Sequence, residues 1–389
     1  MKKLLLFSLI LGLMASCKKE NWESETIACT LSEDINAQHP KSAQLKVIMD
    51  HYTSIGLSGV SIALHDEDGY WAGASGYAKI EDQTALSHCH LLYSQSVAKT
   101  YLAVAVMQLE EADMIELDNS IDTYLSREVL DLLPDVSEIT VEMLLNHTSG
   151  LPEYNQQADY VTYLFQHPLE PFTPMNYLEL IEGKKLTSKP GTDYRYTNTN
   201  YVLLAMMVDG ITGDHARFIR SNIFHYAGLE NSHYHNNENF LENDLLVNSY
   251  WDRYSNGVIE NCSEMQKTNV KTLIGDDGII ATPLDYVKFS KSLFENKLVS
   301  EKTLNRMLKN GLRESDDYLY GYGIHESVYK GKKEHGHSGG GIGAGCYLAY
   351  FPETKTHLFI GINMGTIIHS PLFDDLEQMV DEIFDEAIR

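Results

Sequence analysis

The alternation of apolar and polar residues predicts strands near both ends of the chain and helices between them. A helix is expected at 41–54, followed by two β-rich runs at 59–78 that form a hairpin. The pattern is mainly helical over 91–262, a second hairpin is expected at 345–365, and an amphipathic helix follows at 371–388. Because strands from distant parts of the chain must meet to close one sheet, the helical region is predicted to be an insertion rather than a separate domain.

One of the predicted helices carries a lysine in an apolar setting. The run 101–107 after Lys99 is apolar nearly all round, which is typical of a helix buried on several sides. A buried ammonium must be paired or lose its proton, so Lys99 needs a partner or a function. Ser96 lies three residues earlier, on the same face and at the helix N-terminus, where backbone N–H groups favour developing negative charge. The pair is a candidate nucleophile and base, although many S-x-x-K strings are only a capping serine and a solvated lysine.

A second candidate stretch lies just before another apolar helix. Tyr196 and Asn198 are two residues apart, and in an extended segment both side chains project to one side. The phenol can relay a proton, and the amide can hold both a substrate carbonyl and the lysine. Taken alone, Tyr196 is equally compatible with a core aromatic residue.

A third candidate stretch enters a strand in a glycine-rich segment. It contains His337, Ser338 and Gly339, and the following Gly340 lets a substrate backbone approach closely. The N–H of Gly340 could complete an oxyanion hole with that of Ser96. A histidine in such a turn is often only a surface residue, but the three stretches in this order together favour an active site.

The first residues have the features of a secretory signal. A basic start precedes an apolar stretch at 4–13, which is too short to span a membrane comfortably, and small residues precede Cys17. The segment resembles a bacterial lipobox, which predicts removal of residues 1–16, lipidation of Cys17 and a polar tether over 17–40. Simple export with cleavage nearby is the alternative. We therefore expect a lipid-anchored protein of the bacterial cell envelope, periplasmic or at the cell surface, with the membrane contacted through the lipid only.

The charge composition of the chain limits the classes of molecule that it can bind. The chain has 30 basic and 55 acidic residues, a formal charge of −25, which argues against nucleic acid and against an anionic membrane surface. The four other cysteines, Cys29, Cys89, Cys262 and Cys346, are far apart and form no CxxC pair, so the sequence assigns no disulfide although an exported protein could form one. Free buried thiols are expected.

The histidine pairs at 88–90 and 233–235 have no partner set at zinc-like spacing, so we predict no metal site and no cofactor. His147 is expected to brace a loop by hydrogen bonding rather than to perform chemistry.

The three motifs S-x-x-K, Y-x-N and H-x-G, with the stretches 115–154 and 275–293, resemble the serine β-lactamase and penicillin-binding-protein superfamily. The branch that the chain resembles contains class C β-lactamases, D-alanyl-D-alanine carboxypeptidases, D-aminopeptidases and related esterases. The resemblance implies an α/β (α+β) fold in which an antiparallel sheet is flanked by helices, with an inserted all-helical region. The hydrolase domain would span 41–389, with its sheet part at about 41–90 and 263–389, its helical part at about 91–262, and the site in the groove between them.

The resemblance also implies roles. Ser96 would be the acylated nucleophile, Lys99 its base, and Tyr196 the proton shuttle to the leaving group and the activator of the deacylating water. Asn198 would position the substrate, and residues 337–340 would bind it. His337 stands where the K-T-G form of the motif has lysine, and a histidine is only partly charged near neutral pH, so peptidase or esterase action is favoured over efficient β-lactamase action.

A second departure is the pair Asp276 and Asp277, where the family often carries small residues; two carboxylates facing the groove would discourage anionic substrates. The predicted function is that of an exported serine hydrolase acting through an acyl-enzyme on a small amide or ester, with D-amino-acid peptides and cell-wall fragments among the candidate substrates. Two alternatives stay open: a β-lactamase, and a catalytically idle binding or sensing lipoprotein. A small-molecule or peptide substrate is the expected partner, and the oligomeric state is not predicted.

Overall fold

The computed structural model describes residues 22–237, 239–315, 317–367 and 369–389. The predicted signal peptide at 1–16 and the predicted lipidation site Cys17 lie outside these residues. Within them, no helix combines the length and the apolar character that crossing a membrane requires.

The main sheet has nine strands, all paired antiparallel, in the order β3-β2-β1-β14-β13-β12-β11-β10-β9. Strand β1 pairs with β14, with Val60 opposite Ile362, and this pairing brings together the two distant parts of the chain, as predicted. The strands are β1 (Gly59–Asp66), β2 (Gly69–Lys79), β3 (Thr84–Ala85), β9 (Arg313–Ser315), β10 (Tyr318–Tyr320), β11 (His325–Tyr329), β12 (Lys332–Gly340), β13 (Gly345–Phe351) and β14 (Thr356–Ile362).

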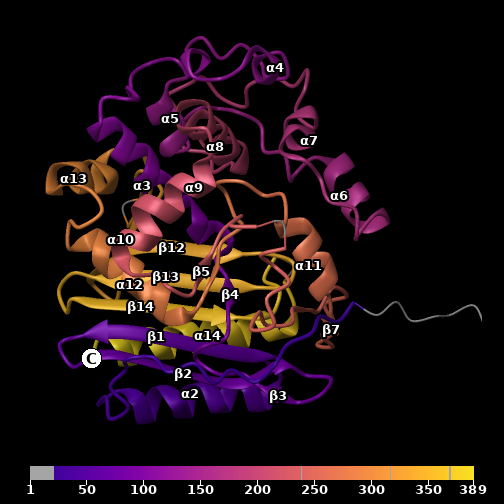
Figure 1. Cartoon of the computed structure of the whole chain (residues 1–389), viewed down its shortest axis with the longest axis vertical. Helices are drawn as coiled ribbons and strands as arrows, with labels where there is room; N and C mark the ends of the chain where they lie inside the picture. Colours follow the sequence, from indigo (N-terminus) through magenta and orange to yellow (C-terminus); the bar gives the residue numbers. More distant parts are fainter. Residues whose placement is uncertain (1–21, 238, 316, 368) are drawn as a thin grey trace, which may run out of the picture.

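Both faces of the sheet are covered because its central strands are apolar on both sides. From β1, Ile62 and Leu64 pack into the cluster with α2 (Ser42–Ile55) and α14 (Pro371–Ala387), while Ala63 joins the opposite cluster. That opposite face is covered by α12 (Pro283–Phe294), and its apolar cluster continues upward into α3 (Ala98–Glu111) (Figure 1). A sheet between two helical layers results.

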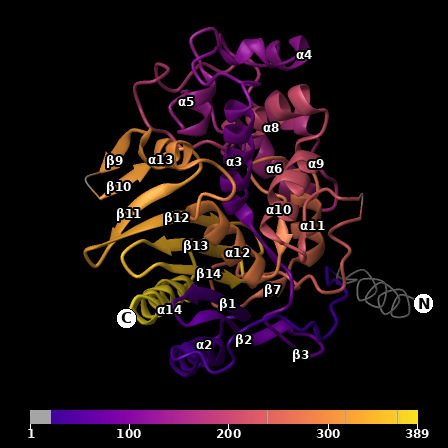
Figure 2. The ribbon, with the colours of Figure 1, turned by 60° about the vertical axis from the view of Figure 1, so that its left-hand side comes forward.

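The helical region stands above the sheet and surrounds α3 (Figure 2). The side chains of α3 from Ala98 to Met107 are all buried, which confirms the predicted burial of this helix on several sides. The remaining helices are η1 (Gln95–Val97), η2 (Ile121–Thr123), α4 (Arg127–Leu130), α5 (Val141–Leu145), α6 (Ala158–Gln166), α7 (Pro174–Glu179), α8 (Asn198–Thr212), α9 (His215–Ile219), η3 (Arg220–Phe224), α10 (His225–Ala227), α11 (Ser263–Val270) and α13 (Glu301–Lys309). Short strand pairs link the two regions: β4 (Leu92–Tyr93) and β5 (Ser232–His233) flank β8 (Ile280–Ala281), and β6 (Tyr250–Trp251) pairs with β7 (Glu260–Asn261).

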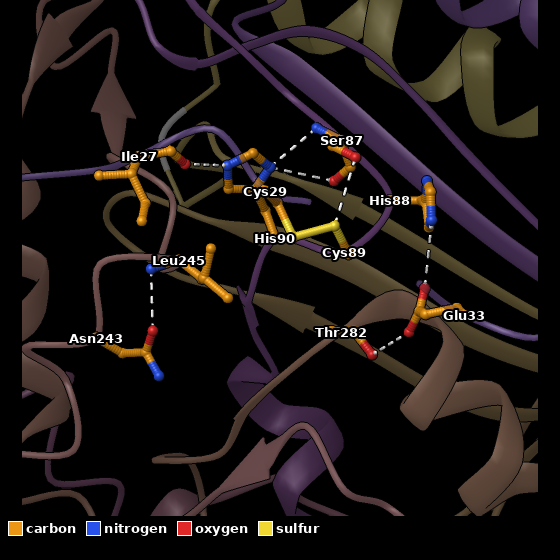
Figure 3. The surroundings of a disulfide bond; sticks show 10 residues. All are labelled: Ile27, Cys29, Glu33, Ser87, His88, Cys89, His90, Asn243, Leu245 and Thr282. Carbon is orange, nitrogen blue, oxygen red and sulfur yellow. Dashed lines mark hydrogen bonds and ion pairs between the residues drawn. A yellow bond between two sulfur atoms is a disulfide. The ribbon is translucent and has the colours of Figure 1, made fainter. Parts of the chain in front are cut away.

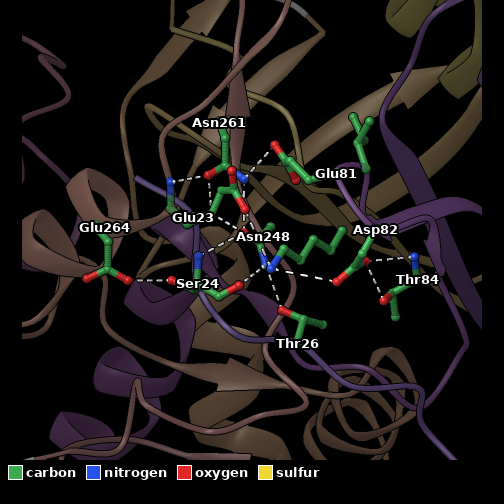
Figure 4. Close-up of polar contacts among 12 residues, drawn as sticks. Glu23, Ser24, Thr26, Glu81, Asp82, Thr84, Asn248, Asn261 and Glu264 are labelled. Atoms are coloured by element: carbon green, nitrogen blue, oxygen red, sulfur yellow. Dashed lines mark hydrogen bonds and ion pairs between the residues drawn. The ribbon is translucent and has the colours of Figure 1, made fainter. Parts of the chain in front are cut away.

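The segment 22–40, here called the N-terminal strap, lies against the domain instead of forming the free tether that was predicted. Ser24 and Thr26 are buried, and the Asn248 side chain donates hydrogen bonds to the carbonyl oxygen of Ser24 (3.0 Å) and to Oγ1 of Thr26 (2.7 Å) (Figure 4). The Ser24 N–H donates in return to Asn248 Oδ1 at 3.0 Å. The polar residues of the strap therefore pair with the domain, and polarity alone did not reveal this.

A disulfide fastens the strap. Cys29 and Cys89 are bonded, with their Cα atoms 6.0 Å apart, and next to them the imidazole Nε2 of His90 lies 2.9 Å from the carbonyl oxygen of Ile27 (Figure 3). The prediction of free thiols is therefore wrong for these two cysteines, because their sequence separation of 60 residues gives no local sign of contact. Cys262 and Cys346 are free and buried, as predicted.

Candidate active site

Ser96 and Lys99 meet at the start of α3. The Lys99 Nζ donates a hydrogen bond to Ser96 Oγ at 3.1 Å and another to the carbonyl oxygen of Asp276 at 2.9 Å. Lys99 is 0% exposed, and burial lowers its pKa, while the charges of Asp276, Asp277 and Glu153 act in the opposite direction. The lysine is thus held within reach of the serine hydroxyl in surroundings that favour loss of its proton.

The residue before the serine has an unusual backbone. Gln95 has φ of +45°, a left-handed conformation that non-glycine residues adopt rarely. The turn that it makes places Ser96 in η1, directly before α3. There the N–H groups of the first helical turn have no carbonyl partner within the helix.

Tyr196 lies on the other side of the lysine. The Lys99 Nζ is 5.2 Å from the centre of the Tyr196 ring. Burial raises the pKa of Tyr196 well above its ordinary value, and the Ser96 side chain opposes this rise. The phenol oxygen makes no hydrogen bond of ordinary geometry within the described residues, so a neutral hydroxyl stands beside the serine with its hydrogen-bonding capacity unused.

Asn198 is the first residue of α8, and its N–H donates to Glu153 Oε2 at 2.6 Å. Its side chain makes no hydrogen bond with Lys99 in the described part of the chain, unlike the arrangement expected from the sequence. Asn198 instead lines a cavity next to Ser96. Glu153 therefore places a carboxylate at the N-terminus of α8, where the helix dipole favours negative charge.

His147 braces this segment, as predicted. Its Nδ1 accepts a hydrogen bond from the Thr197 N–H at 3.3 Å and lies 3.2 Å from the side-chain nitrogen of Asn200. Its ring lies 4.3 Å from that of Tyr196, centre to centre. Burial and the Lys99 charge lower the pKa of His147 well below its ordinary value, so the imidazole is neutral.

Strand β12 forms the wall opposite η1. A Cβ atom on Gly339 would lie 2.7 Å from the Gln95 Cβ and 2.8 Å from the Ser94 carbonyl oxygen, so a side chain at this position would push the strand away from the nucleophile. The next residue, Gly340, lines the cavities beside Ser96. The absence of a side chain at Gly339 thus permits the close approach of β12 to η1.

His337 is neutral and already bonded on both ring nitrogens. Burial and the nearby Lys99 charge lower its pKa well below its ordinary value. Nδ1 lies 2.6 Å from the Ser338 carbonyl oxygen, which can only accept, so Nδ1 carries the proton. The Tyr320 hydroxyl then donates to Nε2 at 2.8 Å. This histidine supplies no fixed positive charge in place of the lysine of K-T-G.

Two cavities of similar size flank Ser96, and both are lined by Ser96 and Gly340. One, the tyrosine cavity, has a volume of about 410 Å³ and is lined by Tyr194, Arg195, Tyr196, Tyr318, Tyr320 and His337. The other, the acidic cavity, has a volume of about 430 Å³ and is lined by Asn198, Tyr160, Phe165, Trp251, Asp276 and Asp277.

The two aspartates face the acidic cavity from a turn between Leu273 and β8. Asp276 Oδ2 accepts from the Tyr154 hydroxyl at 2.6 Å, whereas its Oδ1 has no partner within the described residues. Asp277 Oδ1 accepts from the Gly278 N–H at 2.7 Å. Burial raises the pKa of Asp276 and raises that of Asp277 to about 7.

Sequence reasoning assigned no role to Glu153, Tyr154 or Tyr320, which complete the site. Glu153 and Tyr154 end the stretch LLNHTSGLPEY, in which a run of small and polar residues follows an apolar helix, and this was a usable sign of a buried loop. Tyr320 lies 17 residues before His337 and gave no such sign.

A larger hollow of about 1050 Å³ lies near the turn between β1 and β2 and contains none of the predicted site residues. Close by, His39, Asp66 and Asp68 form the one group of potential metal ligands among the described residues, and the histidine pairs at 88–90 and 233–235 do not belong to it. Asp66 already pairs with Lys41 at 2.6 Å.

A family model described as Beta-lactamase matches residues 45–372. Penicillin-binding protein 4* from Bacillus subtilis (strain 168) is 26% identical over 326 residues, which cover 78% of this chain and 67% of that protein. Putative penicillin-binding protein PbpX from the same strain is 23% identical over 283 residues, which cover 72% of this chain and 66% of that protein. The chain thus spans about two thirds of the length of these relatives.

Solved structures show the same fold. D-amino acid amidase from Ochrobactrum anthropi SV3, complexed with L-phenylalanine amide, superposes with a TM-score of 0.75 at 22% identity, over 89% of this chain and 98% of that one. D-stereospecific amidohydrolase from Streptomyces sp. superposes with a TM-score of 0.72 at 20% identity, over 83% and 94% of the two chains. The predicted fold, an antiparallel sheet flanked by helices with an inserted helical region, is confirmed.

Proposed function

The chain belongs to the beta-lactamase family, and we propose that it is a serine hydrolase that cleaves small amides or esters through an acyl-enzyme at Ser96. The observation that carries this proposal is the 3.1 Å hydrogen bond from the buried Lys99 Nζ to Ser96 Oγ. A protein that only binds a ligand has no need for an ammonium buried beside a serine in an apolar helix.

In the acylation step, neutral Lys99 takes the proton of Ser96 Oγ while Oγ attacks the substrate carbonyl carbon. The negative charge moves to the carbonyl oxygen, where the N–H groups of Ser96 and Gly340 stabilise it. The tetrahedral intermediate then expels the leaving group. The Tyr196 hydroxyl donates its proton to the leaving group and takes a proton from Lys99 in return. In deacylation, a water molecule gives its proton to Tyr196 and Lys99 and attacks the acyl carbon. Ser96 Oγ then leaves and takes a proton back, which restores the free enzyme.

Amides and esters of amino acids are the substrate class that the site favours. The neutral His337 gives no constant charge for the carboxylate of a penicillin. Two proteins of the same fold are a D-amino acid amidase and a D-stereospecific amidohydrolase, which supports D-amino-acid amides or peptides as the first substrates to test.

The chemical test is labelling with a fluorophosphonate followed by mapping of the modified residue. We expect labelling of the wild type at Ser96 and none in Ser96→Ala. The matched control is Ser290→Ala, because Ser290 Oγ lies 2.9 Å from a basic atom, His357 Nδ1, but is buried away from both cavities, and this variant should label normally. A label on any other serine, or none on folded protein, would overturn the proposal.

We also propose export with a lipid anchor at Cys17. The Cys29–Cys89 disulfide supports this location, because such bonds persist in oxidising compartments. In a bacterial host the protein should partition into detergent and Cys17→Ser should not, whereas Cys29→Ser, which removes only the disulfide, should partition as the wild type does. Equal partition of Cys17→Ser and wild type would contradict the anchor.

A further inference from the structure

The positions of the two cavities assign one to each half of a substrate. Tyr196 lines the tyrosine cavity and passes the proton to the leaving group, so the leaving group lies on that side of Ser96. The acyl group then lies on the other side, in the acidic cavity, where Asn198 is available to its polar atoms. The residues of the acidic cavity therefore decide which acyl groups the enzyme accepts.

The floor of the acidic cavity holds more carboxyl groups than cations. Asp276 and Asp277 are 3% and 7% exposed, and Glu153 lies close enough to act on Asp276. Among the described residues, the cation that acts on all three carboxyls is Lys99. Lys99 is one ammonium beside three carboxyl groups, and burial raises the pKa of all three, so a second cation in the cavity would stabilise their ionised forms.

Two buried polar atoms among the residues that line this cavity have no partner within the described part of the chain. One is Asp276 Oδ1, and the other is the indole Nε1 of Trp251, a side chain that is 3% exposed. Buried polar groups are nearly always hydrogen-bonded in folded proteins. An unpaired carboxylate oxygen in a cavity beside the nucleophile suits a ligand that brings N–H donors and a positive charge.

The mouth of the same cavity is apolar and open. Val161 and Phe165 on α6 are 44% and 49% exposed, and Ile367 is 54% exposed. Phe165 lies against the Trp251 ring at 5.8 Å, centre to centre. An apolar surface of this kind beside an active site is typical of the contact face for a bulky apolar substituent.

We propose that the acidic cavity selects acyl groups with a free protonated amine, held by Asp276 and Asp277, next to a bulky apolar side chain, held by Phe165 and Trp251. This inference rests on the proposed serine hydrolase. It specifies amides or esters of apolar amino acids with an unblocked amino group. N-acylated compounds, penicillins included, bring no charge and one N–H donor in place of three, so they place an uncharged amide beside the carboxyl groups.

The test compares phenylalanine amide, in both enantiomers, with its N-acetyl derivative. Wild type should cleave the free-amine compound with a kcat/KM about tenfold higher or more, the effect of one charge-assisted hydrogen bond. Asp277→Asn, which keeps the acceptor for the Gly278 N–H, should reduce this ratio to about one or two. The control Asp159→Asn removes the same charge from an exposed position on α6 and should leave the ratio unchanged.

A second variant tests the apolar contact at the mouth. Phe165→Ser alters a half-exposed side chain, so the protein should fold, and the preference for phenylalanine amide over alanine amide should fall about fivefold or more. An unchanged preference would overturn the assignment of this face.

The outcomes separate this inference from the function on which it rests. Fluorophosphonate labelling of Ser96 with equal turnover of free and N-acetylated amides would overturn the inference and leave the hydrolase intact. Absence of labelling would overturn the hydrolase. In that case calorimetry with 2-phenylethylamine and the uncharged 2-phenylethanol still tests the cavity: the amine should bind about tenfold more tightly to wild type, and equal binding would overturn the inference.

Discussion

The two cavities beside Ser96 have nearly equal volumes and opposite chemistry. The tyrosine cavity is lined by phenols and by the neutral His337, whereas the acidic cavity combines two buried aspartates with an aromatic mouth. A single serine therefore presents two different environments to the two halves of one substrate. On the proposed mechanism, Ser96 and Lys99 determine the reaction, while the residues that line the two cavities determine the orientation and selection of the substrate.

The largest expected effect concerns Lys99, which donates a hydrogen bond to the serine that lines both cavities. Lys99→Met keeps the length of the side chain and removes the base, so labelling of Ser96 and turnover of every substrate should fall by about 10³-fold or more. The measurement is the rate of fluorophosphonate labelling on protein shown to be folded by circular dichroism. If labelling continued at the wild-type rate, Lys99 would be a structural residue and the catalytic base would have to be sought elsewhere.

The second prediction tests whether the tyrosine cavity is the side of the leaving group. Tyr196→Phe removes the proton relay, which amides need because their leaving nitrogen must be protonated. Hydrolysis of amino-acid amides should fall about 10²-fold, whereas p-nitrophenyl esters, whose leaving group departs as an anion, should lose much less. The measurement is kcat/KM for both substrate classes. Equal losses for both would contradict the assignment of the two sides.

The third prediction concerns charge in the tyrosine cavity. His337→Lys should raise the relative kcat/KM for carboxylate-bearing substrates such as penicillins by roughly ten- to a hundredfold, the effect of one charge-assisted contact. The neutral variant His337→Gln is the matched control and should give no such gain, because it changes shape without charge. A wild-type protein that hydrolyses a cephalosporin faster than every ester and amide tested would show that carboxylate recognition does not need a cation at this position.

The sequence predicted those parts of the fold and site that depend on local pattern. Burial of α3 and the closing of the sheet by β1 and β14 both follow from the periodicity of apolar residues. Motif spacing also placed Ser96 near Lys99. Each of these features can be predicted from residues within one or two helical turns of each other, or from two clear hairpin patterns.

The parts that the sequence did not reveal depend on contacts between distant residues. The Cys29–Cys89 bond joins a strap that looked solvated because its residues are polar. The environment of Asp277 likewise depends on Lys99 and Asp276 together, and whether its carboxyl faces water or a cavity is decided by packing. No spacing rule gives the burial that raises its pKa.

The last prediction uses the raised pKa of Asp277 to test whether cation binding in the acidic cavity depends on pH. Because burial raises the pKa of Asp277 to about 7, its carboxyl is largely protonated at pH 6 and largely ionised at pH 8, so the acidic cavity gains negative charge over this interval. The amine of 2-phenylethylamine, like that of lysine, stays protonated throughout. Its binding, measured by calorimetry, should therefore tighten from pH 6 to pH 8 by a factor of up to about ten.

The other groups that act on Asp277 are Asp276, Lys99, the Gly278 N–H and the Ser94 hydroxyl. Loss of the Lys99 proton over the same interval would strengthen binding of the amine further, so Asp277→Asn is needed to isolate the carboxyl. In that variant the dependence on pH should flatten, while binding of the uncharged 2-phenylethanol should not change with pH in either protein. If the amine bound with the same affinity at pH 6 and pH 8 in the wild type, Asp277 would not be the group that gives the acidic cavity its preference for a cation.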